Sequence, residues 1–313
     1  MKIAWFFPGQ GAQFVGMGRE LLQQSAAARR VFEQAEVALG ESVARLVLEG
    51  PEEDLTLTAN AQPAIVTTSI AILEAIRERL PTMQLPAFAA GHSLGEYSAL
   101  VAAGALSLSD AVRLVRARGK AMQDAVPTGT GAMAAVLSIG AEQLEEICRE
   151  AAQGEVVSAA NFNAPGQIVI AGHAGAVARA SELCAREKGK AIALKVSAPF
   201  HCALMGPAAR VVERELGNVA VRVPNFPVVA NVDARPNVDP ERTKELLVRQ
   251  VDGPVRWEQA VRFMVAEGVT HALEIGPGKV LAGLAKRIAK ELRVLSVSDP
   301  ASLAEVAGFL GTE

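Results

Sequence analysis

Ser93 lies between two glycines in Gly91-His92-Ser93-Leu94-Gly95, a spacing that can present a serine as a nucleophile. Glycines at these two positions let a strand turn sharply into a helix, because a Cβ there would clash. The serine would then stand at the start of the helix, where free N–H groups and the helix dipole favour a developing anion. The alternative is a loop serine that only caps this helix.

A serine nucleophile needs a base within hydrogen-bonding reach, and the chain has four histidines. His92 is adjacent to the serine, but successive side chains diverge, so we expect it to be structural. His173 and His271 fall in expected strands and are better explained as core or surface residues. His201, in SAPFHCALM, lies where the chain is expected to return to its main unit beside a cleft. Position alone makes it the leading candidate.

The elements around Ser93 alternate between strand and helix. Short apolar runs at 2–7 and 86–90 predict buried strands, and the second leads directly into the serine turn. Helices are predicted at 96–106 and 107–126, the latter with serine and aspartate at its start. Such alternation indicates an α/β fold with a mostly parallel sheet, which together with the serine turn we describe as α/β-hydrolase-like.

The middle of the chain has a different pattern. Residues 130–197 predict strand, helix, two strands about a Pro-Gly turn, helix and strand, which is the ferredoxin-like α+β order. We therefore expect a large α/β domain formed by 1–129 and 198–313, interrupted by a small domain at 130–197. Small-molecule sites tend to lie in clefts between domains.

Composition excludes several classes of protein. The 313 residues carry a net charge of -3, which gives no sign of nucleic-acid binding. No apolar run approaches the ~20 residues of a membrane span. Three scattered cysteines are too few for a disulfide framework or a zinc site. We expect a reduced, cytoplasmic protein that is monomeric and binds no metal and no membrane.

Seven blocks of sequence, in order along nearly the whole chain, carry a family resemblance. They resemble the malonyl-CoA:acyl carrier protein transacylases, an acyltransferase family of fatty acid and polyketide synthesis. The blocks are FFPGQGAQFVGMG, GHSLGEYSAL, RGKAMQ, NFNAPGQIVIAG, SAPFHCALM, NVDARP and EIGPGKVLAGL.

The resemblance implies a role for each matching residue. Ser93 would carry the acyl group, and His201 would be its general base. The backbone N–H groups of Gln10 and Leu94 would form the oxyanion hole. The backbone carbonyl of Gln250 would orient the imidazole, a task that an acid performs in other serine enzymes.

Other matching residues would select the substrate. Arg118 corresponds to the family's carboxylate clamp, and a guanidinium can hold the free carboxylate of malonyl through two parallel hydrogen bonds. Phe200 matches a bulky residue that leaves little room beside C2 and favours malonyl over methylmalonyl. Three residues match pocket-lining positions, although core packing explains the methionines equally well: Met122, Met133 and Asn163.

The implied reaction is a ping-pong transfer of malonyl from malonyl-CoA to the phosphopantetheine thiol of acyl carrier protein, without any cofactor. Because carrier proteins are acidic, a basic patch should receive them, and Lys286 and Arg287 are candidates. Solvated helix charges are the simpler explanation for both. Two other classes stay open: a serine hydrolase of thioesters or esters, and a non-catalytic module that binds the carrier.

Overall fold

The computed structural model describes residues 1–311 and contains two separate β-sheets. The main sheet has the strand order β10-β9-β1-β2-β7-β8, and all neighbours are parallel except β7 and β8. Its strands are β1 (Lys2–Phe7), β2 (Phe88–Gly91), β7 (Val228–Val229), β8 (Pro236–Asn237), β9 (Val269–Ile275) and β10 (Arg293–Val297). The smaller sheet consists of β3 (Gly131–Leu137), β4 (Val157–Ala164), β5 (Gln167–His173) and β6 (Lys190–Ala193).

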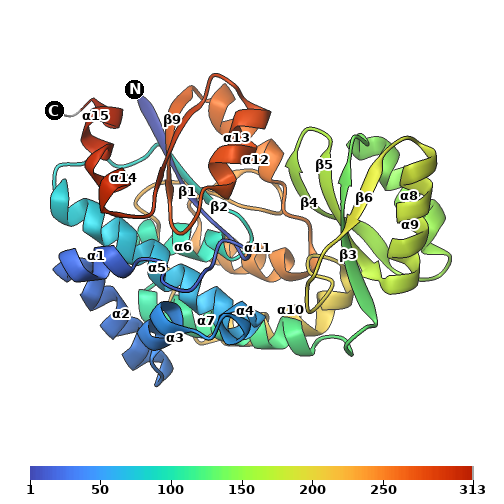
Figure 1. Ribbon diagram of the computed structural model, residues 1–313, viewed down its shortest axis with the longest axis horizontal. Coiled ribbons are helices and arrows are strands. Elements are labelled where there is room, and N and C mark those ends of the chain that lie inside the picture. The colour runs from blue at the N-terminus through green and yellow to red at the C-terminus, as the bar shows by residue number, and fades with distance from the viewer. Residues whose placement is uncertain (312–313) are drawn as a thin grey trace.

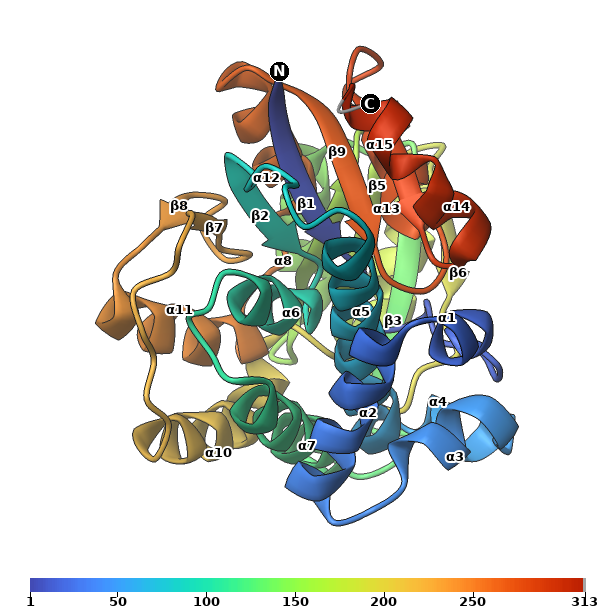
Figure 2. The ribbon, with the colours of Figure 1, turned by 90° about the vertical axis from the view of Figure 1, so that its left-hand side faces the viewer.

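Helices cover both faces of the main sheet (Figure 1, Figure 2). In the first part of the chain they are α1 (Arg19–Gln24), α2 (Ala26–Leu39), α3 (Val43–Glu49), α4 (Glu52–Thr56), α5 (Thr58–Arg79), α6 (Gly95–Ala102) and α7 (Leu108–Asp124). In the second part they are α8 (Ala141–Ala152), α9 (Ala174–Arg186), η1 (Ala203–Met205), α10 (Gly206–Gly217), α11 (Pro240–Asp252), α12 (Trp257–Ala266), α13 (Val280–Ile288), α14 (Pro300–Ala304) and α15 (Val306–Leu310).

The central strand β1 shows why the sheet is covered on both sides. Successive side chains of a strand point to opposite faces. Trp5 and Phe7 belong to a core cluster shared with α5, α6 and α7, whereas Phe6 belongs to a second cluster with α12 and α13. All three are fully buried, so the strand is apolar from residue 3 to residue 7, as a parallel sheet between two helical layers requires, and only Lys2 at its start is exposed.

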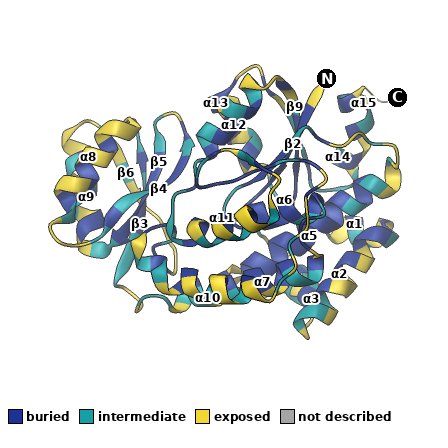
Figure 3. Ribbon diagram, turned by 180° about the vertical axis from the view of Figure 1, so that it is seen from behind, coloured by how far each residue is buried: buried dark blue, intermediate teal, exposed yellow. Residues whose placement is uncertain are grey.

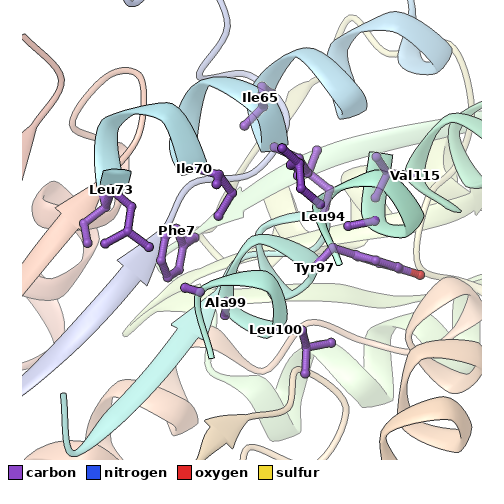
Figure 4. Packing of buried hydrophobic residues seen from close by; sticks show 14 of the residues in the cluster. Phe7, Ile65, Ile70, Leu73, Leu94, Tyr97, Ala99, Leu100 and Val115 are labelled. Carbon is purple, nitrogen blue, oxygen red and sulfur yellow. The ribbon is translucent and has the colours of Figure 1, made fainter. Parts of the chain in front are cut away.

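The helix that follows the serine turn is fixed by the larger of these clusters. Figure 4 shows Phe7 of β1, Ile65 and Ile70 of α5, and Leu94 and Tyr97 at the start of α6 packed together. All five side chains are at most 4% exposed. The start of α6 is therefore held by close packing between strand β1 and helix α5.

The smaller sheet lies at one end of the molecule with α8 and α9 packed on its outer face (Figure 1). Its order is β4-β5-β3-β6, with every pair antiparallel. Its other face places Met133 and Val169 in a small cluster with Cys202, which lies in the segment that returns to the main unit. Exposed residues gather on the outward sides of helices such as α8 and α10, whereas α5 is largely buried (Figure 3).

Two short strands end close to the site. β6 ends at Ala193, and residues 194–196 line a cavity. β7 has only two residues, and Asn231, which follows it, bonds to the serine loop through its side chain. No helix within residues 1–311 is long and apolar enough to span a membrane.

Candidate active site

The turn that carries Ser93 is confirmed as a tight passage from β2 to α6. Ser93 has a left-handed backbone with φ of 51°. A Cβ on Gly91 would lie 1.9 Å from the backbone of Gly95, and a Cβ on Gly95 would lie 2.2 Å from the carbonyl oxygen of Phe7. Only glycine fits these two positions, so the sequence spacing that first singled out the serine has a steric cause.

The side chain of Asn231 bonds to the backbone of this turn, a contact that no sequence pattern predicts. Its Oδ1 accepts from the Ser93 amide at 2.7 Å, and its Nδ2 donates to the Gly91 carbonyl at 2.7 Å. The Asn231 side chain thus gives hydrogen-bond partners to the Ser93 N–H and the Gly91 C=O, two backbone groups of the turn. The NVDARP block contained this asparagine, but nothing in the sequence indicated what it would bind.

Ser93 and His201 meet, although 108 positions separate them. The Ser93 Oγ lies 2.7 Å from His201 Nε2. The other ring nitrogen, Nδ1, lies 2.9 Å from the Gln250 carbonyl and 3.2 Å from the Gly253 carbonyl. Carbonyl oxygens only accept, so Nδ1 carries the hydrogen and Nε2 is left to accept the serine proton.

His201 is buried, and its backbone is also left-handed, with φ of 60°. Burial lowers the pKa of His201 to about 3, with a further contribution from the positive charge of Arg118. The imidazole is therefore neutral at physiological pH, which is the form that can accept a proton. No aspartate or glutamate bonds to it within residues 1–311; Asp233 accepts from the Arg235 amide and pairs with Arg242.

Arg118 is a buried cation in direct contact with the nucleophile. Its Nη2 donates to Ser93 Oγ and to Gln250 Oε1, both at 3.0 Å, and its Nη1 donates to Gln62 Oε1 at 2.7 Å. Its side chain is 1% exposed, and burial lowers its pKa. In the part of the chain described, the Nε–H donor has no hydrogen-bond partner. The guanidinium is thus held by neutral acceptors only, which suits a site that awaits an anion.

A cavity of about 340 Å³ opens onto Ser93, His201 and Arg118. The other predicted residues that line it are Gln10, Met122, Met133, Asn163 and Phe200. Both methionines are almost fully buried, so they pack in the core and face the cavity at once. Leu94 has a buried side chain and stands at the N-terminal cap of α6, and the next two amides, of Gly95 and Glu96, donate to the His92 and Ser93 carbonyls.

The remaining histidines lie apart from the serine hydroxyl. His92 lines the cavity, and its Nε2 lies 2.8 Å from Asn163 Oδ1, a contact compatible with the structural role expected for it. His173 Nδ1 accepts from the Val156 amide, and His271 Nδ1 lies beside the Thr270 hydroxyl. Of the four, only His201 bonds to Ser93.

Lys286 and Arg287 are exposed on α13, whose Val280, Leu281 and Leu284 line the cavity. Arg287 is engaged within the chain, since its guanidinium donates to the Gln167 side chain and to the Pro165 carbonyl of the β4–β5 turn. No cluster of three or more His, Cys, Asp or Glu that could hold a metal occurs in residues 1–311.

The comparisons with known proteins identify the family. A model of the acyl transferase domain matches residues 4–312, and the chain belongs to this family. It is 50% identical over 305 residues to the malonyl CoA-acyl carrier protein transacylase of Bacillus subtilis (strain 168), across 96% of this chain and 95% of that protein.

Solved structures agree. An acyl carrier protein S-malonyltransferase from Vibrio cholerae is 48% identical, with a TM-score of 0.95, over 98% of this chain and 100% of that one. A malonyl-transacylase in complex with its holo type II PKS acyl-carrier protein is 44% identical, with a TM-score of 0.95, over 100% of both chains.

Proposed function

We propose that this chain transfers a malonyl group from malonyl-CoA to the phosphopantetheine thiol of acyl carrier protein, through a malonyl-Ser93 intermediate. The observation that carries the proposal is the 2.7 Å contact between Ser93 Oγ and His201 Nε2 beside a buried guanidinium. The similar proteins from Bacillus subtilis and Vibrio cholerae are a malonyl CoA-acyl carrier protein transacylase and an acyl carrier protein S-malonyltransferase, which supports the same reaction.

In the first half-reaction His201 takes the hydroxyl proton as Ser93 Oγ attacks the thioester carbonyl. The oxyanion is received by the backbone N–H groups of Gln10 and Leu94, each of the kind worth about 10²–10³ in rate. The C–S bond then breaks, and coenzyme A leaves as the thiol with the proton from His201. The Gln250 carbonyl keeps the imidazole in the tautomer that this step needs.

The second half-reaction runs the same steps in reverse order. His201 takes the proton of the carrier's phosphopantetheine thiol, whose sulfur attacks the malonyl ester. The ester C–O bond breaks, Ser93 recovers its proton from His201, and malonyl leaves as the carrier thioester. Every bond is exchanged between protein and substrate groups, so the cycle needs no resident cofactor.

Arg118 is the proposed selector for malonyl. The distal carboxylate of malonyl would pair with the buried guanidinium, which otherwise has only neutral acceptors around it. An acetyl group would leave that charge unpaired in the cavity. Phe200, Met122, Met133 and Asn163 would shape the space around the acyl chain, with Phe200 restricting substituents at C2.

We also propose a division into two domains. Residues 1–129 and 198–313 would form an α/β-hydrolase-like domain, which the strand-turn-helix setting of Ser93 supports. Residues 130–197 would form a ferredoxin-like domain. In the chain order of its own four strands, the small sheet runs 2-3-1-4 and is antiparallel throughout, as that fold requires. Cavity-lining residues come from both parts, which supports a site between them.

For the carrier protein we propose docking at the exposed end of α13. Lys286 has no hydrogen bond or ion pair within residues 1–311 and is available to an acidic partner, whereas Arg287 also braces the β4–β5 turn. Both lie in the last turn of the helix whose Val280, Leu281 and Leu284 line the cavity, which would bring the phosphopantetheine arm to its mouth.

One experiment separates this function from its two rivals. The protein is incubated with malonyl-CoA, with and without holo carrier, and analysed by intact-mass spectrometry and product assay. A malonyl adduct that passes to the carrier is expected; release of free malonate would indicate a hydrolase, and no adduct would indicate a binding module. Ser93→Ala should abolish the adduct. Ser98→Ala, in the helix that follows the serine turn, removes a buried hydroxyl that has no hydrogen-bond partner within residues 1–311 and should keep the adduct.

A further inference from the structure

A buried carboxylate that takes no part in the proposed reaction lies directly behind the serine turn. Glu96 is in the first turn of α6 and is 3% exposed. Its Oε2 accepts from Gln250 Nε2 at 2.7 Å and from the Asn231 backbone amide at 3.0 Å. The carboxylate is therefore built into the same small group of residues that holds Ser93 and Arg118.

The Gln250 amide connects Glu96 to Arg118. Its Nε2 donates to Glu96 and, at 2.9 Å, to the Ser93 carbonyl, while its Oε1 accepts from Arg118 Nη2 at 3.0 Å. If the amide were flipped, Nε2 would face the guanidinium donors, and Oε1 would face two acceptors. The acceptors on one side thus force the oxygen toward Arg118.

We propose that Glu96 is a positioning residue for malonyl recognition: it fixes the Gln250 amide, which in turn fixes the Arg118 guanidinium for the substrate carboxylate. Glu96 itself touches neither substrate nor reacting atoms. The inference rests on the proposed function, because it assigns to Glu96 a share in the selectivity of that reaction.

The effect of Glu96 on stability distinguishes a positioning role from simple packing. Burial raises the pKa of Glu96 to about 7, even though the bonds from Gln250 and Asn231 and the charge of Arg118 favour ionisation; Asp233 opposes it. Because the folded-state pKa of Glu96 lies above its ordinary value, Glu96 contributes stability that is lost as pH rises from about 4.5 to about 7. Glu96→Gln removes the cost of a buried charge, so the variant should keep or gain stability. Its selectivity for malonyl should nevertheless fall, because the charged acceptor that holds Gln250 is lost.

The test compares wild type, Glu96→Gln and Glu96→Ala as the full chain at pH 8. For each, kcat/KM for acylation is measured with malonyl-CoA and acetyl-CoA, together with the urea midpoint of unfolding. In E96Q a neutral acceptor replaces a charged one, so we expect the malonyl/acetyl ratio to fall about fivefold while the urea midpoint is unchanged or higher. In E96A, where the acceptor is gone, we expect the ratio to fall further.

Glu274→Gln is the matched control. Glu274 is also a fully buried glutamate, but its carboxylate accepts from the Leu281 and Ala282 amides and from Ser296, away from Arg118. We expect E274Q to keep the wild-type ratio whatever it does to stability.

The outcomes distinguish the two proposals. If wild type forms no malonyl adduct, the proposed function fails and this inference fails with it. If wild type is malonylated but a folded Glu96 variant keeps a ratio within twofold of it, only the positioning role is overturned. Should E96A not fold, E96Q decides the matter alone. A ratio that falls equally in E274Q would also overturn the inference.

Discussion

Replacing Arg118 by alanine removes a buried cation beside Ser93 and tests the basis of malonyl selection. Within residues 1–311 this guanidinium is 1% exposed and donates only to Ser93, Gln250 and Gln62. With malonyl bound, the charge gains a carboxylate partner inside the cavity; with acetyl bound, it does not. The two substrates should therefore differ by the free energy of a buried ion pair.

The size of the effect follows from that pairing. Removing one partner of a buried ion pair costs about 3–5 kcal/mol, and 1.36 kcal/mol corresponds to a tenfold change in rate. We expect R118A to lower kcat/KM for malonyl-CoA by at least about 10²-fold. Acetyl-CoA should lose far less, since in the variant it no longer leaves a cation unpaired.

The assay is the rate of coenzyme A release during acylation, followed with malonyl-CoA and acetyl-CoA on the same preparations. Arg118→Lys is the informative companion, because it keeps the charge but loses the planar pair of donors, and we expect intermediate selectivity. The reasoning is refuted if folded R118A discriminates between the two substrates as wild type does.

Three further perturbations test other parts of the site. Gly95→Ala places a Cβ 2.2 Å from the Phe7 carbonyl oxygen, so its urea unfolding should show a loss of about 1–3 kcal/mol; an unchanged midpoint would contradict the steric account of the turn. Because the charge of Arg118 helps to depress the pKa of His201, NMR titration of the imidazole should give a higher pKa in R118A than in wild type, and equal values would exclude a contribution from Arg118. Lys286→Glu should raise KM for the carrier and leave KM for malonyl-CoA unchanged; a parallel rise in both would exclude docking at this end of α13.

The parts of the site that could be predicted from sequence are those with a local cause. Gly91 and Gly95 indicate the turn because a Cβ at either position would lie about 2 Å from neighbouring backbone atoms, and this requirement appears in the five-residue motif itself. The strand β1 is a short continuous apolar run, and the helix α7 has apolar residues at helical spacing. His201 could be placed beside a cleft from the order of elements, but its selection as the base needed the family resemblance.

The residues that escaped prediction act through distant partners. Asn231 and Glu96 are 135 positions apart yet bond to each other, and neither has a local pattern that would indicate the other. Helix α5 was not predicted either: it contains Pro63 and the run Thr67–Thr68–Ser69, which are poor helix formers, and packing on both sides overrides this preference. That helix carries Gln62, whose amide oxygen holds Arg118.

The two residues that meet to perform the chemistry, Ser93 and His201, both have left-handed backbones, with φ of 51° and 60°. A residue other than glycine in this region costs on the order of 1–3 kcal/mol, so the pair persists only because its surroundings hold it. For Ser93 those surroundings are Asn231 and the Gln250 amide, which bond to its N–H and C=O; for His201 they are the carbonyls of Gln250 and Gly253. Gln250 contacts both residues, since its side-chain amide donates to the Ser93 carbonyl and its backbone carbonyl accepts from His201 Nδ1. The geometry of the two catalytic groups is therefore coupled through one residue of α11, and a change that displaces this residue should disturb both halves of the proton transfer together.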